Sequence, residues 1–580
     1  MRRKLLRNVL FLGLALLLLG GAAARLTSAR AAMQPGVSLS TQTLPLLKHA
    51  KKLRPAPAGQ KLDLSIGLRL RDASYAQALL REVSNPKSPR YHHYFSRAQF
   101  KALLAPTPAQ VQQVQVYLQS QGFQVSSVSS NGLLINASGT VAQAQQSFQT
   151  QIDIYQSKNR VFYVNSNPPS IPMDISQLVT SIGGLDNAQQ LHTHYQQRAL
   201  DNTNAPTPPI GLSPKDLASA YDINPLYNAS LQGQGQNIAL LELDGYQQSD
   251  VQQYFNAYAL PMPTIKNIQV DHFNGAAGQG SMESALDIEM AGSIAPRSTL
   301  YVYEGISTTQ GINNIYNRIV NDNNAQIVSL SWGLCEDGLG QDEVQTLNNI
   351  FTQGSLQGMS FFAASGDSGA YDCQDENLGV DSPASDPNVT GVGATTLQLD
   401  ANAAYVSESV WSNPQNMIRG PKGAGSGGGL SKFFDQPSWQ NAPGVQNQYS
   451  NGKREVPDVM SFGDMRVGFS VYCTVKNAGC PPGGWTKIGG TSVAAPFWAA
   501  SFLLVNQYVQ SQQQNSVGLA NPALYGLANS PQPYPAYHPI STGNNLYYAA
   551  TGAYSLAAGL GSPDVYNIAR DLASNTNSNG

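Results

Sequence analysis

The feature that most constrains the fold is a regular alternation of strand-like and helical segments in the middle of the 580-residue chain. Apolar runs of strand length cover residues 237–243, 299–305, 325–333 and 359–369. Stretches with helical spacing lie between them, at 283–293, 311–321 and 341–357. Strands rich in Val, Ile, Leu and Ala that alternate with helices indicate an α/β fold with a parallel sheet covered on both faces. In such a sheet, sites form beyond the carboxyl ends of the strands.

The chain is too long for one compact core, and its charge divides it into two parts. Residues 1–205 carry 21 Lys and Arg and 7 Asp and Glu, whereas residues 206–580 carry 13 and 29. A basic part joined to an acidic part suggests docking through complementary charge, although such an asymmetry can equally be without consequence. The acidic second part argues against nucleic acid as a partner.

The first part reads as a small α+β unit over about residues 60–185. Residues 61–70 alternate like a strand, and residues 74–83 and 107–122 have helical spacing. A polar, proline-bearing stretch at 187–211 reads as a linker. After it, Ser213 as N-cap, Pro214 at the first helical position and Asp216 at the third predict a helix that opens the second domain.

The N-terminus has the pattern of a secretory signal peptide. A basic start is followed by a short apolar run and then by small residues. The run is too short to favour a spanning helix, although an uncleaved anchor is an alternative. We therefore expect a signal peptide over residues 1–32 and a secreted protein with no other membrane association.

The cysteines are four in number, and all lie in the second half of the chain. An even count in an exported protein suggests disulfides. Of the three possible pairings we favour Cys473–Cys480, which closes a short loop, together with Cys335–Cys373; free buried thiols are the alternative. The cysteines lack the CxxC spacing and nearby histidine pair of a zinc site, so we expect no metal there.

Ser492 is a candidate nucleophile. It follows Gly489, Gly490 and Thr491 and precedes a long apolar run that predicts a buried helix, with Pro496 in its first turn. This places Ser492 at a helix N-terminus, where its own N–H can help to bind an oxyanion. The plainer alternative is a serine that caps a core helix.

A nucleophilic serine needs a base, and none of the seven histidines is well placed. His272 follows Asp271, but adjacent residues on an extended segment face opposite ways and make a poor relay. Glu283 and Asp287 are four residues apart on an expected helix and therefore share a face. Two coupled carboxyls can share a proton and raise a pKa, although an ordinary acidic helix face would have the same spacing.

Asp367 lies in a glycine-flanked turn where a strand ends, the expected position of a site. A buried carboxyl there could stay protonated and donate a hydrogen bond to a developing oxyanion. The alternative is a turn aspartate bonded to its own backbone.

At these residues the chain resembles the sedolisins, the serine-carboxyl peptidases that include the pro-kumamolisin proteins. The motifs are GTSxxxP at 490–496, ExxLDIExAGxxAP at 283–296 and SGDSG at 365–369. Further matches lie at 329–333, 427–440, 454–459 and 559–563, and residues 84–100 look like the family's pro-domain signature. GTSxxxP alone is a weak signal, but all of these motifs in family order are a strong one.

The resemblance implies a subtilisin-like parallel sheet preceded by a small ferredoxin-like α+β pro-domain. It implies that Ser492 is the nucleophile, Glu283 its general base, Asp287 the residue that orients Glu283, and Asp367 an oxyanion donor. A glutamate base and a protonated aspartate suit acid operation. The strand that ends at 329–333 is the expected edge for the substrate backbone.

The chain departs from the family's pattern at the calcium site near the C-terminus. Pro539 and Ser555 stand where the family has aspartates. Calcium needs several oxygen ligands, usually including charged ones. We therefore expect no calcium and no other cofactor, with Tyr547, Tyr548 and Tyr554 packing the loop instead.

These features together predict a secreted, acid-acting, monomeric endopeptidase that acts on proteins or peptides. The expected divisions are a signal peptide at 1–32, an activation pro-domain at 33–190, a processed linker at 191–211 and a peptidase domain at 212–580. The pro-domain is expected to be an intramolecular inhibitor. The alternatives are a tripeptidyl-peptidase of the same family and a catalytically inactive exported binding protein.

Overall fold

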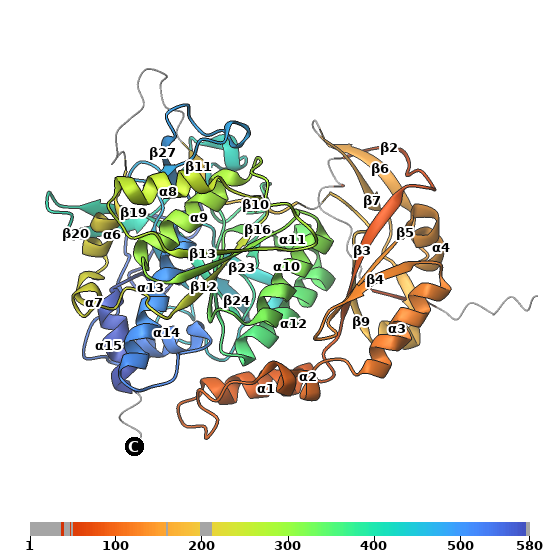
Figure 1. Cartoon of the computed structure of the whole chain (residues 1–580), viewed down its shortest axis with the longest axis horizontal. Helices are drawn as coiled ribbons and strands as arrows, with labels where there is room; N and C mark the ends of the chain where they lie inside the picture. Colours follow the sequence, from red (N-terminus) through yellow and green to blue (C-terminus); the bar gives the residue numbers. More distant parts are fainter. Residues whose placement is uncertain are drawn as a thin grey trace, which may run out of the picture.

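The computed structural model describes residues 36–39, 47, 50–157, 160–188, 190–197 and 211–575 (Figure 1). The expected signal peptide and most of the expected linker, residues 198–210, lie outside the described residues. We refer to residues 50–188 as the N-terminal unit and to residues 211–575 as the C-terminal unit. Among the described residues, no helix has the length and apolar character needed to cross a membrane.

The C-terminal unit is built on a mainly parallel sheet, as the sequence predicted. Its order is β13 (Thr264–Gln269), β14 (Thr299–Glu304), β12 (Asn237–Glu242), β15 (Ile327–Leu330), β17 (Ser360–Ala364), β19 (Val389–Leu399) and β20 (Tyr405–Val410). A further strand, β25 (Val459–Phe462), also pairs with β19. Neighbours in this sheet are parallel except β19 and β20, which are antiparallel.

Helices cover both faces of this sheet and form two cores. Ile238 and Leu240 of β12 belong to the cluster that contains α9 (Ser281–Ile294) and α13 (Thr491–Ser511). Ala239 and Leu241 belong to the cluster on the other face, with α10 (Thr309–Asp322) and α12 (Gln341–Leu356). Successive side chains of a strand point to opposite faces, so an uninterrupted apolar run supplies both cores.

The smaller elements of the C-terminal unit complete the two layers. The helices are α6 (Pro214–Ala220), α7 (Asn224–Asn228), α8 (Gln248–Ala257), α11 (Glu336–Leu339), α14 (Ala520–Asn529) and α15 (Val565–Asn575). The expected capping of α6 is present, because the Ser213 side chain accepts from Asp216 N. Short strands at the edge of the site are β16 (Trp332–Cys335), β18 (Asp381–Ser382), β26 (Phe469–Tyr472) and β27 (Trp485–Gly489).

Both disulfides have the favoured pairing. Cys335 of β16 is bonded to Cys373, and Cys473 is bonded to Cys480 in the loop between β26 and β27. The first bond fastens β16 to the segment that follows Asp367, and the second closes the loop of a hairpin. Both therefore stabilise strands that border the site.

The N-terminal unit has a ferredoxin-like sheet. Its antiparallel order is β4 (Gln124–Val128), β5 (Leu134–Thr140), β3 (Lys61–Leu68) and β9 (Val179–Gly183). The helices α1 (Ala73–Ser84), α2 (Arg97–Leu103) and α3 (Pro108–Ser120) connect β3 to β4, and α4 (Val141–Ser147) follows β5. This β-α-β-β-α-β order is the ferredoxin-like one. A second sheet consists of β2 (Lys51–Pro55), β6 (Ile152–Ser157) and β7 (Arg160–Asn165).

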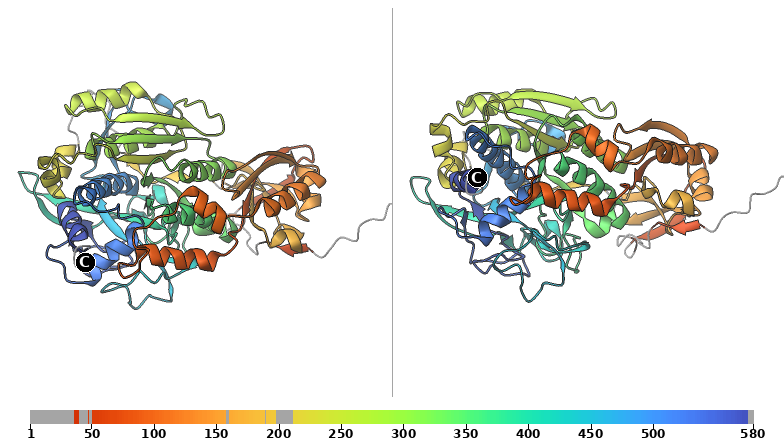
Figure 2. Two further views of the ribbon diagram at one scale, coloured as in Figure 1. Left: turned by 60° about the horizontal axis from the view of Figure 1, so that its bottom comes forward. Right: turned by 90° about the horizontal axis from the view of Figure 1, so that it is seen from below.

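The N-terminal unit packs on α10 and α12 of the C-terminal unit (Figure 1). In Figure 2, α1 and α2 extend from it along the C-terminal unit, and their apolar side chains join the core cluster of α12. Hydrogen bonds between uncharged groups cross the contact. Asn131 Nδ2 donates to Asn317 Oδ1 at 2.6 Å and to Gln353 Oε1 at 2.8 Å, and the Ser181 and Thr346 hydroxyls are 2.8 Å apart.

Short ion pairs do not join the described parts of the two units, although Arg69 lies close enough to Asp342 to oppose the rise of its pKa, so docking through complementary charge stays a prediction. Among the described residues, no Lys or Arg of the N-terminal unit forms an ion pair with an Asp or Glu of the C-terminal unit. The opposite net charges are therefore not matched by ionic contacts at the interface. Apolar packing and hydrogen bonds make up the contact, and one of these bonds runs from the Arg97 guanidinium to Asn321 O at 2.6 Å.

Candidate active site

Five elements bring the candidate residues together beyond the carboxyl ends of the central strands. Glu242 ends β12, Ser331 follows β15, and Asp367 follows β17. Glu283 lies on α9, and Ser492 begins α13. The structure thus places every predicted site residue at the edge of the sheet where the fold class predicts a site.

Ser492 is buried at the N-terminus of α13, with no exposed surface. Gly490, which precedes the helix, has φ 119°, a conformation that favours glycine and lets the chain turn from β27 into the helix. The Ser492 hydroxyl donates to Ser331 O at 3.3 Å. The serine is therefore positioned by the end of β15, and its own backbone N–H is not used within the helix.

Glu283 and Asp287 share one buried face of α9, and neither has exposed surface. Burial raises the pKa of Glu283 well above its usual range, and the charges of Glu242 and Asp367 raise it further, while the nearby Ser492 hydroxyl and Arg419 oppose the rise. Neither carboxylate oxygen of Glu283 has a hydrogen-bond partner among the described residues. The Ser492 hydroxyl must therefore turn from Ser331 O to reach Glu283.

Asp287 is fixed by a hydrogen bond, since its Oδ1 accepts from Ser331 Oγ at 2.9 Å. Burial raises its pKa well above the usual range, and the charge of Glu283 adds to the rise. The charge of Glu283 thus acts on Asp287, while a proton shared between the two carboxyls stays a prediction.

Glu242 is a third carboxyl in this set, and the sequence analysis missed it. It is fully buried, its Oε2 accepts from Trp332 Nε1 at 3.2 Å, and burial together with the charge of Asp287 raises its pKa well above the usual range. The sequence did contain an indication of this role, because Glu242 is an acidic residue at the end of a central strand, where sites form in such sheets. The apolar run before it suggested only a core strand.

Asp367 lies on the other side of Ser492. Its Oδ1 accepts from Thr491 N at 2.8 Å and from Thr491 Oγ1 at 3.1 Å, while its Oδ2 has no hydrogen-bond partner among the described residues. Burial raises the pKa of Asp367 to about 6, although Arg419 and His194 oppose the rise. Its protonated form therefore persists into weakly acid solution and has an oxygen free to donate.

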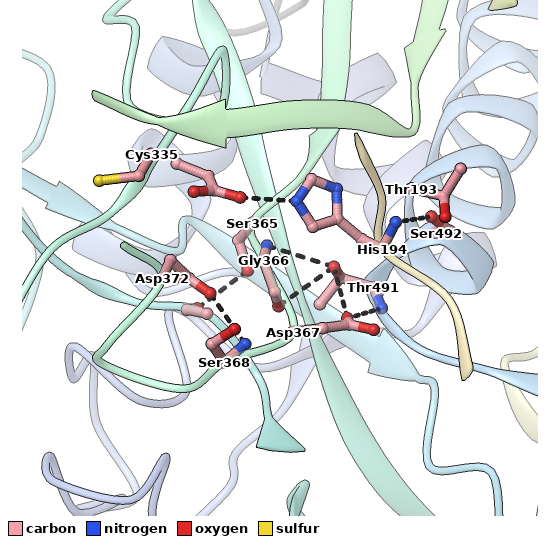
Figure 3. Close-up of polar contacts among 12 residues, drawn as sticks. Thr193, His194, Cys335, Ser365, Gly366, Asp367, Ser368, Asp372, Thr491 and Ser492 are labelled. Atoms are coloured by element: carbon pink, nitrogen blue, oxygen red, sulfur yellow. Dashed lines mark hydrogen bonds and ion pairs between the residues drawn. The ribbon is translucent and has the colours of Figure 1, made fainter. Parts of the chain in front are cut away.

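The chain segment 190–197 occupies the site. Its strand β10 (His192–Thr193) pairs antiparallel with β16, and β11 (Gln196–Gln197) pairs antiparallel with β27. Between them, Ser492 N donates to His194 O at 2.9 Å, and His194 N donates to Ser492 Oγ at 3.0 Å (Figure 3). This segment begins the stretch that was expected to be a processed linker, and it lies across the nucleophile like a bound peptide.

The carbonyl of His194 lies where an oxyanion would form. A Cβ on Gly490 would be 2.1 Å from His194 O and 2.7 Å from Asp367 Oδ2, so both oxygens converge on the space that this glycine leaves open. The Ser492 N–H already donates to the carbonyl, and Asp367 Oδ2 stands beside it. The peptide bond from His194 to Tyr195 is therefore presented to Ser492.

The other acidic and histidine side chains do not enter this chemistry. Asp271 and His272 are exposed and both have positive φ, in a loop far along the chain from Ser492. Glu289 is buried but accepts from Tyr472 N at 3.0 Å, which fixes β26. The His194 ring contacts Ser331 O and Asp381. The structure thus brings carboxyls close to Ser492, as the sequence predicted, and places His272 away from it.

Comparisons with known proteins agree with this arrangement. Residues 48–188 match the family model for the pro-kumamolisin activation domain, and residues 272–519 match that for the subtilase family. The chain is 28% identical to sedolisin of Pseudomonas sp. (strain 101) over 95% of its own length and 92% of that protein. It is 29% identical to kumamolisin of Bacillus sp. (strain MN-32), over 88% of its own length and 91% of that protein.

The fold has a counterpart among solved structures as well. One such structure is Pseudomonas sedolisin, a serine-carboxyl proteinase solved in complex with two molecules of pseudo-iodotyrostatin. It matches this chain with a TM-score of 0.55 and 27% sequence identity, over 63% of this chain and 99% of that one. The matching proteins also include tripeptidyl-peptidases. With its activation domain, its subtilase-type core and its serine beside buried carboxyls, this chain is a serine peptidase similar to the sedolisins.

Proposed function

We propose that the chain is the zymogen of a secreted, acid-acting serine-carboxyl endopeptidase whose catalytic residues are Ser492, Glu283, Asp287 and Asp367. The observation that carries this proposal is the placement of the His194–Tyr195 peptide bond against Ser492, with its carbonyl oxygen on the Ser492 N–H. The pro-domain would then inhibit by placing its own chain in the site. Secretion is supported by the signal-peptide pattern and by two disulfides.

In the proposed mechanism Glu283 accepts the Ser492 hydroxyl proton as Oγ attacks the carbonyl carbon, and later returns it to the leaving amine. Burial raises the pKa of all three carboxyls, and the mechanism requires that Glu283 has given up its proton when Ser492 attacks while Asp287 and Glu242 keep theirs. The Ser492 N–H and protonated Asp367 donate to the oxyanion. With its pKa near 6, Asp367 is protonated in acid, which suits an acid-acting enzyme.

An endopeptidase is favoured over a tripeptidyl-peptidase by the path of the segment. His192 is the third residue on the amino side of the presented bond, and Leu191 beyond it is buried in the core cluster of α12. The chain continues past the third residue, as an endopeptidase substrate must. A catalytically inactive binding protein would have no need for a scissile bond against an intact serine.

The endopeptidase proposal is tested with an N-terminally acetylated peptide that carries the sequence of residues 190–197. Acid-treated enzyme should cleave this blocked peptide after the histidine equivalent to His194, and mass spectrometry identifies the products. A tripeptidyl-peptidase needs a free amino terminus, so cleavage of only the unblocked peptide, three residues from its end, would favour that alternative. Cleavage of neither would support the binding protein.

We also propose that the enzyme needs no calcium. Pro539 offers no side-chain ligand, and Ser555 Oγ accepts from Ala558 N at 3.2 Å. Tyr548 and Tyr554 are buried here, and Tyr547, although about half exposed, packs edge to face on Tyr548 with the ring centroids 4.8 Å apart. The residues present do not fit a calcium site with charged oxygen ligands.

A strong chelator should therefore cause no drop in the thermal midpoint of the full-length protein that added calcium restores. A bound ion at 100 times its Kd would stabilise the protein by about 2.7 kcal/mol, and its removal would lower the midpoint by several degrees. Differential scanning calorimetry with and without the chelator makes the measurement. A drop that added calcium reverses would contradict the proposal.

A further inference from the structure

Two histidines of the 190–197 segment meet Asp381 of β18 in a cluster beside Ser492. One ligand atom of each of His192, His194 and Asp381 lies within 4.8 Å of the other two. His194 Nε2 is 2.6 Å from Asp381 Oδ2, and the two imidazole rings meet edge to face at 4.9 Å. His194 and Asp381 have no exposed surface. None of the three side chains takes part in the proposed proton transfers.

The ring nitrogen of His194 that faces Asp381 has the geometry of a metal ligand. Its Nδ1 is 3.1 Å from Ser331 O, and because a carbonyl oxygen only accepts, Nδ1 carries the hydrogen. In the neutral ring Nε2 then accepts, and at 2.6 Å it shares a proton held by the Asp381 carboxyl, which a bound metal ion would displace. Metal-bound histidines have this arrangement, with the other ring N–H held by a backbone carbonyl.

Two further atoms of the cluster lack partners among the described residues. They are His192 Nδ1 and Asp381 Oδ1, and both are buried. Buried polar atoms in folded proteins nearly always have partners, so a set of unpaired lone pairs in one place needs an explanation. One cation among the three side chains would satisfy these atoms together.

The surroundings also favour an added cation. The carboxyls of Asp372 and Asp367 lie close enough to influence the cluster electrostatically. The Arg419 guanidinium faces it from the other side, where it donates to the backbone carbonyls of Thr193 and Tyr195. Three carboxyls against one guanidinium leave room for further positive charge.

We propose that His192, His194 and Asp381 form a binding site for a divalent transition-metal ion, with zinc the best match. Two imidazoles, one carboxylate and a water are a common zinc ligand set, at about 2.0–2.2 Å from the ion. The His194 Nε2–Asp381 Oδ2 pair would have to open by about 1 Å to admit the ion. The HxH spacing was overlooked in the sequence because it lies in the expected linker.

Such an ion would fasten the segment to the peptidase domain. His192 and His194 lie on the amino side of the presented bond, and Asp381 lies in the C-terminal unit. After cleavage the ligands therefore belong to two separate chains, which the ion would hold together. Zinc would therefore stabilise the docked segment and slow its release. The proposed metal site does not depend on the proposed peptidase function. Only the slower release of the segment after processing rests on that function.

The test uses full-length Ser492→Ala protein, which keeps the segment intact whether or not the wild type is a peptidase. After chelation and dialysis at about pH 7.5, zinc binding is measured by equilibrium dialysis with elemental analysis, and cobalt is added as a spectroscopic probe. We expect one zinc per chain with a micromolar or lower Kd, and visible cobalt bands typical of tetrahedral coordination. Because all four cysteines are in disulfides, no thiol competes.

Two histidine variants in this background identify the site. His192→Ala should weaken zinc binding at least about tenfold and abolish the cobalt bands, whereas His272→Ala, in an exposed loop, should change neither. Unchanged thermal midpoints in the absence of metal show that both variants are folded. The proposal would be overturned if the Ser492→Ala protein retained no zinc at about 10 μM free ion. It would also be overturned if the His192→Ala variant bound zinc equally well.

Discussion

Replacing Glu283 with glutamine should stop self-processing almost completely. Glutamine has nearly the same shape as glutamate but cannot accept the Ser492 proton, and removal of a peptidase's base costs on the order of 10⁴–10⁶ in rate. The helix face should remain intact, because the oxygens of Glu283 have no hydrogen-bond partners among the described residues that a neutral amide would lose. The rate of appearance of the processed chain at about pH 4, followed by gel and mass spectrometry, measures the effect.

Glu289→Gln is the matched control, since it makes the same change on the same helix. Glu289 is equally buried, but its carboxylate accepts from Tyr472 N, and a glutamine oxygen can accept the same bond. This variant should process within a few-fold of the wild-type rate. If both variants processed equally well, or if both failed together, the role of Glu283 as the base would be refuted.

Asp367→Ala should lower the processing rate by about 10²–10³-fold, the usual cost of one lost oxyanion donor. It should also change the dependence of the rate on pH. Asp367 donates only when protonated, and burial raises its pKa to about 6, so the wild-type slope of log rate against pH should fall by one unit as pH rises through about 6. The alanine variant should lack this break, because the group that titrates is gone.

A matched control for Asp367 is Asp375→Ala, a half-buried turn aspartate that bonds only to Asn377 among the described residues. It should retain both the rate and the break near pH 6. A break that persisted in Asp367→Ala would show that another group is responsible. A rate loss without any change in the pH profile would point to damage of the Thr491 contacts rather than loss of a donor.

Much of the sheet was predictable from local pattern. The expected runs at 237–243 and 299–305 agree with β12 and β14, and the first part of the run at 359–369 agrees with β17. These strands are recognisable because buried parallel strands are continuously apolar. The strand β13 was missed, since its residues alternate between exposed and half-buried at the sheet edge. The four predicted site residues do converge on one place, as their positions at strand and helix ends imply.

What the sequence could not predict depends on contacts between distant segments. The 190–197 segment is polar and has no periodicity, and its strand conformation comes from pairing with β16 and β27. Docking through neutral side chains was likewise invisible in the net charges of the two parts. Glu242 is identifiable as part of the site only when Trp332 and Asp287 are seen beside it.

The central claim is that Ser492 cleaves the chain that lies across it. The most direct measurement shifts purified full-length protein from about pH 7.5 to about pH 4, beside Ser492→Ala, and determines the new N-termini by mass spectrometry. The wild type should yield a chain that begins at Tyr195, with further trimming before residue 212, while the variant stays whole. Cleavage of the variant at the same bond and rate, or a wild type that stays intact in acid, would contradict the account.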